Sequence, residues 1–314
     1  MKDATNTAQE GDQIWVAKGR YLPGTQRTDH FSLANGVAIY GGFDGTEHSL
    51  NERDPSVNKT ILSGDIDQND QTTAEGITEE ISGNNSYQII VISNQSLNEK
   101  TILDGFILTG GNSNGSSNEP RTDLGSALMM SLNGDLPGDS LFIHARFQNI
   151  IFQRNIGGGP AVFARSRENN TFIVAPIFLN CSFKDNYSNA HGGAFDSFAS
   201  SGEINPSFIH CSFTGNKSGR SGAALSMTTK NTGTKSSLKI INSVFSNNAV
   251  VNSQKHGGAI ALESKGISIM KAVIRQSSFA SNSATLNGND IWVDGTGSNT
   301  SVTSYNTVFG SNNP

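Results

Sequence analysis

The sequence has little charge, few cysteines and no long apolar run. Asp, Glu, Lys and Arg make up 16% of its 314 residues, while Gly, Asn, Ser and Thr are abundant, which favours many short strands joined by tight turns over amphipathic helices. No apolar stretch approaches the roughly 18 residues of a membrane span. The sequence has no CxxC and no Walker loop, so these signatures of redox and nucleotide chemistry are missing.

Positive charge is scarce as well. The chain has 22 basic and 27 acidic residues, a net charge of -5, and no run of basic residues. We therefore do not expect nucleic acid or an anionic membrane surface as a partner, because both need a concentrated positive face. Without a long apolar run we expect no insertion into a membrane either. The chain opens with MKDATNTAQEGD and no export signal, as expected of a mature fragment.

What the sequence does contain is a repeat. Two motifs recur together through its second half at intervals of about 30 residues, which indicates a solenoid. The first comprises GSAL, GPAV, GGAF, GAAL, GGAI and GNDI, ending at Leu128, Val162, Phe195, Leu225, Ile260 and Ile291. The second is Phe-x-x-Asn, at Phe152/Asn155, Phe183/Asn186, Phe213/Asn216, Phe245/Asn248, Phe279/Asn282 and Phe309/Asn312.

Each motif has a mechanical role if one repeat is one coil, with equivalent residues stacked about 4.8 Å apart. The Phe residues would form a buried column, the Asn residues a ladder in a left-handed backbone conformation, and Gly-Gly a tight bend. The sequence thus predicts an all-β fold, a single-stranded right-handed parallel β-helix. It would have three short strands per coil and about 30 residues per coil in the C-terminal two thirds.

We expect a single β-helix domain over residues 1–314. Residues 1–123 would form an N-terminal cap and irregular coils with long polar loops at 43–58, 65–85 and 112–123, followed by regular coils over 124–314. Ala4 and Ala8 are spaced as on one face of a helix that could cover the first coil. The last coil stops without a visible cap, so we expect the chain to continue.

The motifs also carry a resemblance. Phe-x-x-Asn paired with GGA[ILF] resembles the repeat of the chlamydial polymorphic membrane proteins, and GDQIWVAKGRYLPG resembles the first coil of the pectate-lyase-like superfamily. GVAIYGGFDGTE and TILDGFILTGG are similar to stretches of secreted bacterial β-helix proteins. The resemblance covers nearly the whole chain, although GPAV, GAAL and GNDI depart from the signature. It implies a parallel β-helix that is secreted or displayed at the cell surface.

Outward positions on the GGA strands give a first candidate site. Counting alternately from the inward Val162 and Phe195, the side chains of Phe163, Arg165 and Phe198 face outward on adjacent coils. They would form an aromatic and cationic strip for stacking a sugar or gripping a partner. The alternative is that a loop covers these aromatic side chains. An error of one residue in the alternation would remove the strip.

An acidic loop gives a second candidate. Asp65, Asp67 and Asp70 in the sequence DIDQND place carboxylates at intervals that can converge on Ca²⁺, the one cofactor we consider. The alternative is a turn whose side chains bond their own backbone.

Cys181 and Cys211 occupy equivalent positions on adjacent coils. They are either free buried thiols or a disulfide bridge, although parallel side chains rarely offer the torsion of a disulfide.

These observations favour a non-enzymatic module, secreted or at the cell surface, adhesin-like or carbohydrate-contacting and monomeric. Its partner would be an extracellular polysaccharide or a host or neighbour surface molecule. The alternative is a polysaccharide lyase or glycoside hydrolase acting on an extracellular polysaccharide, with no catalytic residue assigned. An enzyme is expected to interrupt the repeat with several charged residues at one groove, for which residues 43–123 are the best place. His191 and His256, separated by a coil, are interpreted as turn residues.

Overall fold

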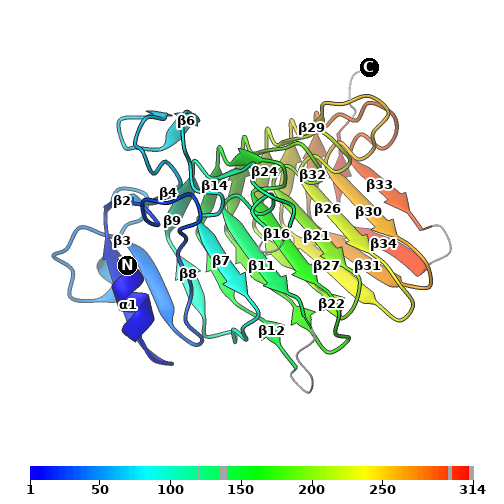
Figure 1. Cartoon of the computed structure of the whole chain (residues 1–314). Helices are drawn as coiled ribbons and strands as arrows, with labels where there is room; N and C mark the ends of the chain where they lie inside the picture. The colour runs from blue at the N-terminus through cyan, green and yellow to red at the C-terminus, as the bar shows by residue number, and fades with distance from the viewer. Residues whose placement is uncertain (119–120, 135–139, 296–298, 311–314) are drawn as a thin grey trace.

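Short strands in this chain pair with strands one coil away, not with their neighbours in sequence. The computed structural model describes residues 1–118, 121–134, 140–295 and 299–310. In that part of the chain all sheets but one small hairpin are parallel, only 3% of the protein is helical, and about five turns repeat every 32 residues or so between 128 and 309. The predicted parallel β-helix is confirmed, and Figure 1 shows its coils stacked along one axis.

Four sheets run along the stack, and we call them A to D. Sheet A contains β1 (Gln13–Ala17), β3 (Ala38–Phe43), β8 (Ile102–Asp104), β12 (Phe142–Ile143), β13 (Arg146–Gln148), β17 (Ile173–Val174), β18 (Ile177–Leu179), β22 (Glu203–Ile204), β23 (Ser207–Ile209), β27 (Lys235–Ile241), β31 (Ile269–Arg275) and β34 (Asn299–Tyr305). Sheet B contains β2 (Gly19–Tyr21), β4 (Thr60–Ser63), β9 (Phe106–Thr109), β14 (Ile151–Gln153), β19 (Ser182–Lys184), β24 (Ser212–Thr214), β28 (Val244–Ser246), β32 (Ser278–Ala280) and β35 (Val308–Phe309).

The other two sheets complete each coil. Sheet C contains β7 (Ile90–Ser93), β11 (Leu128–Leu132), β16 (Val162–Ser166), β21 (Phe195–Ala199), β26 (Leu225–Thr229), β30 (Ile260–Ser264) and β33 (Ile291–Asp294). Sheet D, at a corner, contains β10 (Asn112–Ser113), β15 (Ile156–Gly157), β20 (Tyr187–Ser188), β25 (Lys217–Ser218) and β29 (Ala249–Val250).

The Phe-x-x-Asn motif builds the interior as predicted. Successive rings from Phe152 to Phe309 stack at centroid distances of 4.8, 4.5, 4.5, 4.8 and 5.1 Å. All but the last are fully buried, whereas Phe309 is 47% exposed. Because each ring contacts the ring above and the ring below, the column forms one continuous part of a core that runs from Val16 to Phe279.

The Asn residues of the motif form a buried ladder. The side-chain amide of Asn186 donates to the Oδ1 of Asn216 at 3.0 Å and to the carbonyl of Phe152 at 2.9 Å, and the same pattern recurs at Asn155, Asn216 and Asn248. Each amide therefore satisfies polar groups of neighbouring coils that would otherwise be buried without partners. Asn312 lies outside the described residues.

The backbone conformation of the ladder differs from the prediction. The left-handed position is not the ladder Asn but the residue before it, for example Asp185 with φ 52° and Asn247 with φ 55°. A second left-handed file, which includes Asn149 and Asn180, lies three residues before each Phe. The chain turns at these exposed positions, which leaves the following Asn extended with its side chain inside.

The Gly-Gly corner behaves as predicted. The first glycine adopts a left-handed conformation, with φ +59° at Gly192 and +68° at Gly257. The second lies against the next coil, and a Cβ on Gly193 would come within 2.3 Å of the carbonyl oxygen of Lys217. Only glycine fits this pair of positions without moving the backbone of an adjacent coil.

The first 123 residues are less regular. Helix α1 (Lys2–Thr7) lies beside the first coil, where a capping helix was expected, and a short 3-10 helix, η1 (Leu50–Glu52), lies in loop 43–58. The stretch TILDGFILTGG forms two strands, β8 and β9, bent at Gly105 with φ +82°. Loop 65–85 contains an antiparallel hairpin of β5 (Gln71–Thr72) and β6 (Thr78–Glu80), which projects from the stack in Figure 1.

Candidate functional site: a cleft on the outer face of sheet C

The central strands of sheet C, β11, β16, β21 and β26, lie side by side (Figure 1). Their side chains point alternately into the core and outward. Val162, Ala164 and Phe195 belong to the core, so the alternation used for the prediction is right. Parallel pairing places Phe163 beside Asp196, and Arg165 beside Phe198. The structure therefore brings the three predicted residues together on two adjacent strands and adds an unassigned carboxylate to them.

A cavity of about 620 Å³, here called the cleft, lies over these residues. Its lining consists of Arg121, Leu124, Phe163, Arg165, Arg167, Asp196, Phe198, Ser200, Lys230 and Asn231. The segment 121–124 is held above sheet C by the side-chain amide of Gln88, which donates to the carbonyls of Arg121 at 3.0 Å and Leu124 at 2.7 Å. One of the predicted long loops, 112–123, thus supplies a wall of the cleft.

Two alternatives were considered for the outward side chains, an exposed strip and side chains covered by a loop, and each holds for part of the site. Phe163 is only 4% exposed and Arg165 only 2%, so these two side chains are covered. Phe198 keeps partial exposure, and the ammonium of Lys230 lies 5.1 Å from its ring centroid. The surface available for stacking is therefore the ring of Phe198, with Lys230 at its face.

The cleft collects basic groups from distant parts of the chain. Arg121 pairs with Asp123 at 2.6 Å, Arg167 lies 3.6 Å from a carboxylate oxygen of Glu168, and the Nε of Arg165 donates to the Oγ of Ser131 at 3.1 Å. A second cavity of about 260 Å³ adjoins the cleft and shares Arg121 and Arg165 with it. These cations are not a cluster in the sequence, because they come from a loop and from two different coils, those of β16 and β26.

Asp196 is the acidic group of the cleft. Its Oδ1 is buried and has no hydrogen-bond partner in the part of the chain that the structure describes. Burial raises the pKa of this carboxyl to about 7, against the opposing effect of hydrogen bonds from Ser226 and Ser197. Near neutral pH Asp196 is therefore present in both charged and uncharged forms, and it can accept or donate a hydrogen bond.

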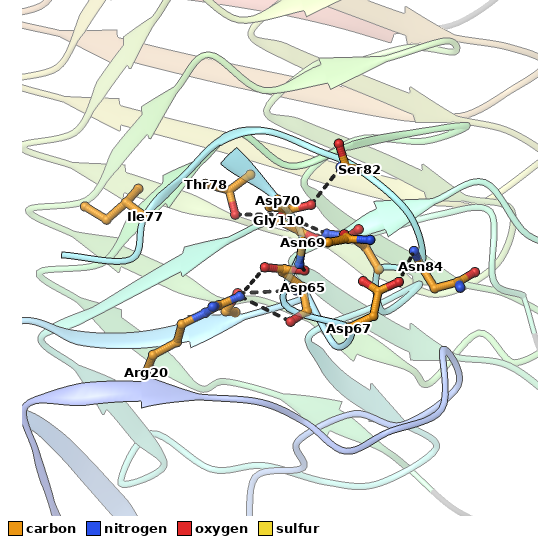
Figure 2. A network of polar contacts seen from close by, with 12 residues as sticks. Arg20, Asp65, Asp67, Asn69, Asp70, Ile77, Thr78, Ser82, Asn84 and Gly110 are labelled. Carbon is orange, nitrogen blue, oxygen red and sulfur yellow. Dashed lines mark hydrogen bonds and ion pairs between the residues drawn. The ribbon is translucent and has the colours of Figure 1, made fainter. Parts of the chain in front are cut away.

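The acidic loop has a different role (Figure 2). Asp65 is paired with Arg20 and accepts a bond from the backbone of Asn69 at 3.0 Å, while Asp67 accepts one from the backbone of Asn84 at 2.9 Å. These contacts close the loop onto itself and onto β2, which is the self-bonding turn considered for this sequence.

Asp70 joins the hairpin to the coils. Its carboxylate accepts bonds from the backbone of Ser82 at 2.7 Å, the hydroxyl of Thr78 at 3.0 Å and the side chain of Asn85 at 3.0 Å, and Asn85 in turn donates to the carbonyl of Gly110 at 2.6 Å. Burial raises the pKa of Asp70. No group of three His, Cys, Asp or Glu side chains among the described residues is arranged to hold a metal ion, and calcium binding stays a prediction.

The cysteines and the histidines beside the Gly-Gly corners are packed within the coils. Cys181 and Cys211 are free, buried thiols that each contact a backbone carbonyl of the preceding coil. The ring of His256 stacks on Trp292 at 4.5 Å, and burial lowers the pKa of His191. These histidines therefore act as packed turn residues.

The chain has no recognisable relatives in comparisons with known proteins. No family model matches it, and no curated protein and no solved structure matches it either.

No helix within the described residues has the length and apolar character to span a membrane. The function must therefore be argued from the cleft itself.

Proposed function

We propose that this chain is an extracellular β-helix module that binds carbohydrate in the cleft. The observation that carries this proposal is the partly exposed ring of Phe198, which lies beside the Lys230 ammonium in a cleft of about 620 Å³ on sheet C. Sugar rings have an apolar face that packs on an aromatic ring and a hydroxyl edge that needs polar partners. The cleft offers both, with Asp196, Arg167 and Asn231 around the ring.

The repeat motifs support the proposed location. Phe-x-x-Asn and GGA[ILF] resemble the chlamydial polymorphic membrane protein repeat, and the first coil resembles the pectate-lyase-like superfamily. Proteins of these groups act outside the cell, so we place this module in the secreted or cell-surface fraction, with an adhesin-like role. The partner would be a polysaccharide or a glycosylated surface molecule.

Glycan binding by the wild-type protein and Phe198→Ala tests the proposal. Loss of the stacking ring should weaken binding of the best oligosaccharide by about tenfold, because aromatic contacts contribute roughly 0.5–1.5 kcal/mol. Trp15→Ala is the matched control, since Trp15 is also an exposed aromatic side chain but lies in the first coil. Equal binding by wild type and Phe198→Ala, or equal loss in both variants, would contradict the proposal.

The second candidate function is cleavage of a polysaccharide. It is favoured by Asp196, because a carboxyl whose pKa burial raises to about 7, in a cleft that also contains basic side chains, suits general acid–base chemistry. Asp196 lies on the regular coils and not in residues 43–123, where an enzyme site was expected. Incubation with a panel of acidic polysaccharides, monitored by the absorbance of unsaturated products, separates the two functions. Turnover that Asp196→Asn abolishes would replace the binding proposal with a lyase.

A further inference from the structure

A second surface lies on the outer face of sheet A, where the strands become long. In earlier coils two short strands are separated by a proline, Pro176 between β17 and β18 and Pro206 between β22 and β23. Leu238 takes the place of Pro206 in the next coil, since Lys239 pairs with Ser207. Proline cannot donate to a ladder, so its replacement allows β27 and β31 to run unbroken for seven residues each.

Four cations lie on these two strands. Lys235 and Lys239 of β27 and Lys271 and Arg275 of β31 are all exposed, and they alternate with buried residues. The register pairs Ser237 with Lys271 and Ile241 with Arg275. The four positive charges therefore form a zigzag along the strand direction, one about every 6–7 Å, which we call the cation strip.

The cation strip is not neutralised by the protein. Among the described residues none of its four cations forms an ion pair, and the neighbouring outward side chains of β23 and β34 are uncharged. Among the described residues of the neighbouring strands, the acidic side chain is that of Glu203, which lies opposite Lys235 in the β22–β27 register and accepts a bond from the Asn205 side chain at 3.0 Å. A chain of net charge -5 thus concentrates four of its 22 basic residues in one row.

The end of the strip adds an aromatic surface. Tyr305 of β34 is 51% exposed, and the guanidinium of Arg275 lies 5.2 Å from its ring centroid. Ile209, Ile241 and Val273 keep partial exposure beside the cations. The surface therefore offers regularly spaced charge together with small apolar areas and one ring that a sugar could pack against.

We propose that the cation strip binds a linear acidic polysaccharide, with its carboxylate or sulfate groups opposite Lys235, Lys271, Lys239 and Arg275. A row of like charges at near-regular spacing complements a polymer that carries one anion on each repeating unit. Single-stranded nucleic acid is disfavoured, because such sites interleave several aromatic rings with the cations and this strip has one. The site is separate from the cleft and does not depend on it.

The test is binding to heparin and to polygalacturonate at low and at physiological ionic strength. Lys239→Glu with Lys271→Glu should weaken binding of the preferred polymer by about tenfold, and wild-type binding should fall steeply with salt. The matched control is Lys184→Glu with Lys217→Glu, which makes the same change in net charge on exposed residues of sheets B and D. Phe198→Ala should leave this binding unchanged, so failure here is distinguishable from failure of the cleft.

Two results would overturn the proposal. Equal weakening by both double variants would show a general charge effect and no specific surface. Tighter binding to a single-stranded oligonucleotide of equal charge than to either polysaccharide, lost in the Lys239 and Lys271 variant, would assign the strip to nucleic acid. Far-UV circular dichroism of each variant ensures that the coils are intact, since all four substitutions lie on exposed side chains.

Discussion

The regular coils and the first 123 residues hold the same stack together by different means. In the regular coils one side chain recurs at each position, so that Phe stacks on Phe and Asn bonds to Asn. In the first coils leucines take the place of the Phe column: Leu62 pairs in register with Leu108, and Leu108 pairs with Phe152. There the long loops are attached by individual polar contacts that do not repeat, among them the ion pairs of Arg20 with Asp65 and of Arg53 with Asp104.

The difference is between contacts that repeat from coil to coil and contacts that each occur once. Repetition allows each regular coil to be stabilised by its neighbours through the same set of contacts. The loops of the first coils have no neighbour of the same shape, and each needs its own buried polar contact. The two regions should therefore respond differently to mutation, and four measurements can test this.

The largest effect is expected in the Phe column. Phe183→Ala should lower the free energy of unfolding by about 3–5 kcal/mol, because the ring is fully buried and stacked on both sides. Leu108→Ala, its match in the irregular region, should cost less, about 2–4 kcal/mol, since no ring stack is interrupted. Urea unfolding measures both. An equal loss in the two variants would remove the proposed difference between the regions.

The next effect is expected in the acidic loop. Arg20→Ala leaves the carboxylate of Asp65, whose side chain is 1% exposed, without its cation, and we expect a loss of about 2–3 kcal/mol. Lys59→Ala removes the exposed pair with Glu75 and should cost less than about 1 kcal/mol. Thermal melts of the two variants compare them directly. A small loss in Arg20→Ala would mean that the loop is held without its ion pair.

The third effect is a pH dependence in the cleft. Burial raises the pKa of Asp196 to about 7, so the folded protein binds its proton more tightly than the unfolded chain, and the stability falls as the pH rises from about 4 to 7. Asp196→Asn removes this loss. It should stabilise the protein by up to about 4 kcal/mol at pH 8, and by much less at pH 4, where the carboxyl is protonated in both states. A pH-independent difference between the two proteins would contradict the raised pKa.

The smallest effect is expected from calcium. Asp65, Asp67 and Asp70 already accept bonds from Arg20, from backbone amides and from Thr78 and Asn85, so a chelator should shift the melting midpoint by less than about 1 °C. Residues 65–85 would then be a protein-bonded hairpin. A clear rise in the midpoint on adding calcium would instead support the predicted ion site.

The repeats made the regular coils predictable and left the loops open. Because Phe and Asn recur once per coil, their columns could be assigned from spacing alone, and alternation correctly turned Phe163, Arg165 and Phe198 outward. The position of segment 121–124 could not be predicted, since it depends on the single side chain of Gln88, which has no repeat. The burial of Asp196 could not be predicted from the sequence either, and so its raised pKa could not be predicted.

The cation strip was missed for a different reason. Lys235 and Lys239 lie four residues apart, as do Lys271 and Arg275, and the two pairs lie one coil apart. A search for basic runs overlooks this pattern, whereas placing the residues in coil register reveals it. The left-handed position was misplaced by one residue, because Asn can occupy either the turn or the ladder and the sequence does not distinguish them.

The hydrogen bonds between coils also decide how the protein would respond to force. In a parallel β-helix these bonds and the Asn ladder join successive coils along the stacking axis, so a pull on the end of the chain acts first on the bonds that hold the terminal coil. The stack should then peel in successive steps, each releasing about 10 nm of chain from the roughly 32 residues of a coil. A protein built in this way would lengthen under tension at its end coil while the cleft, which lies on other coils, kept its shape.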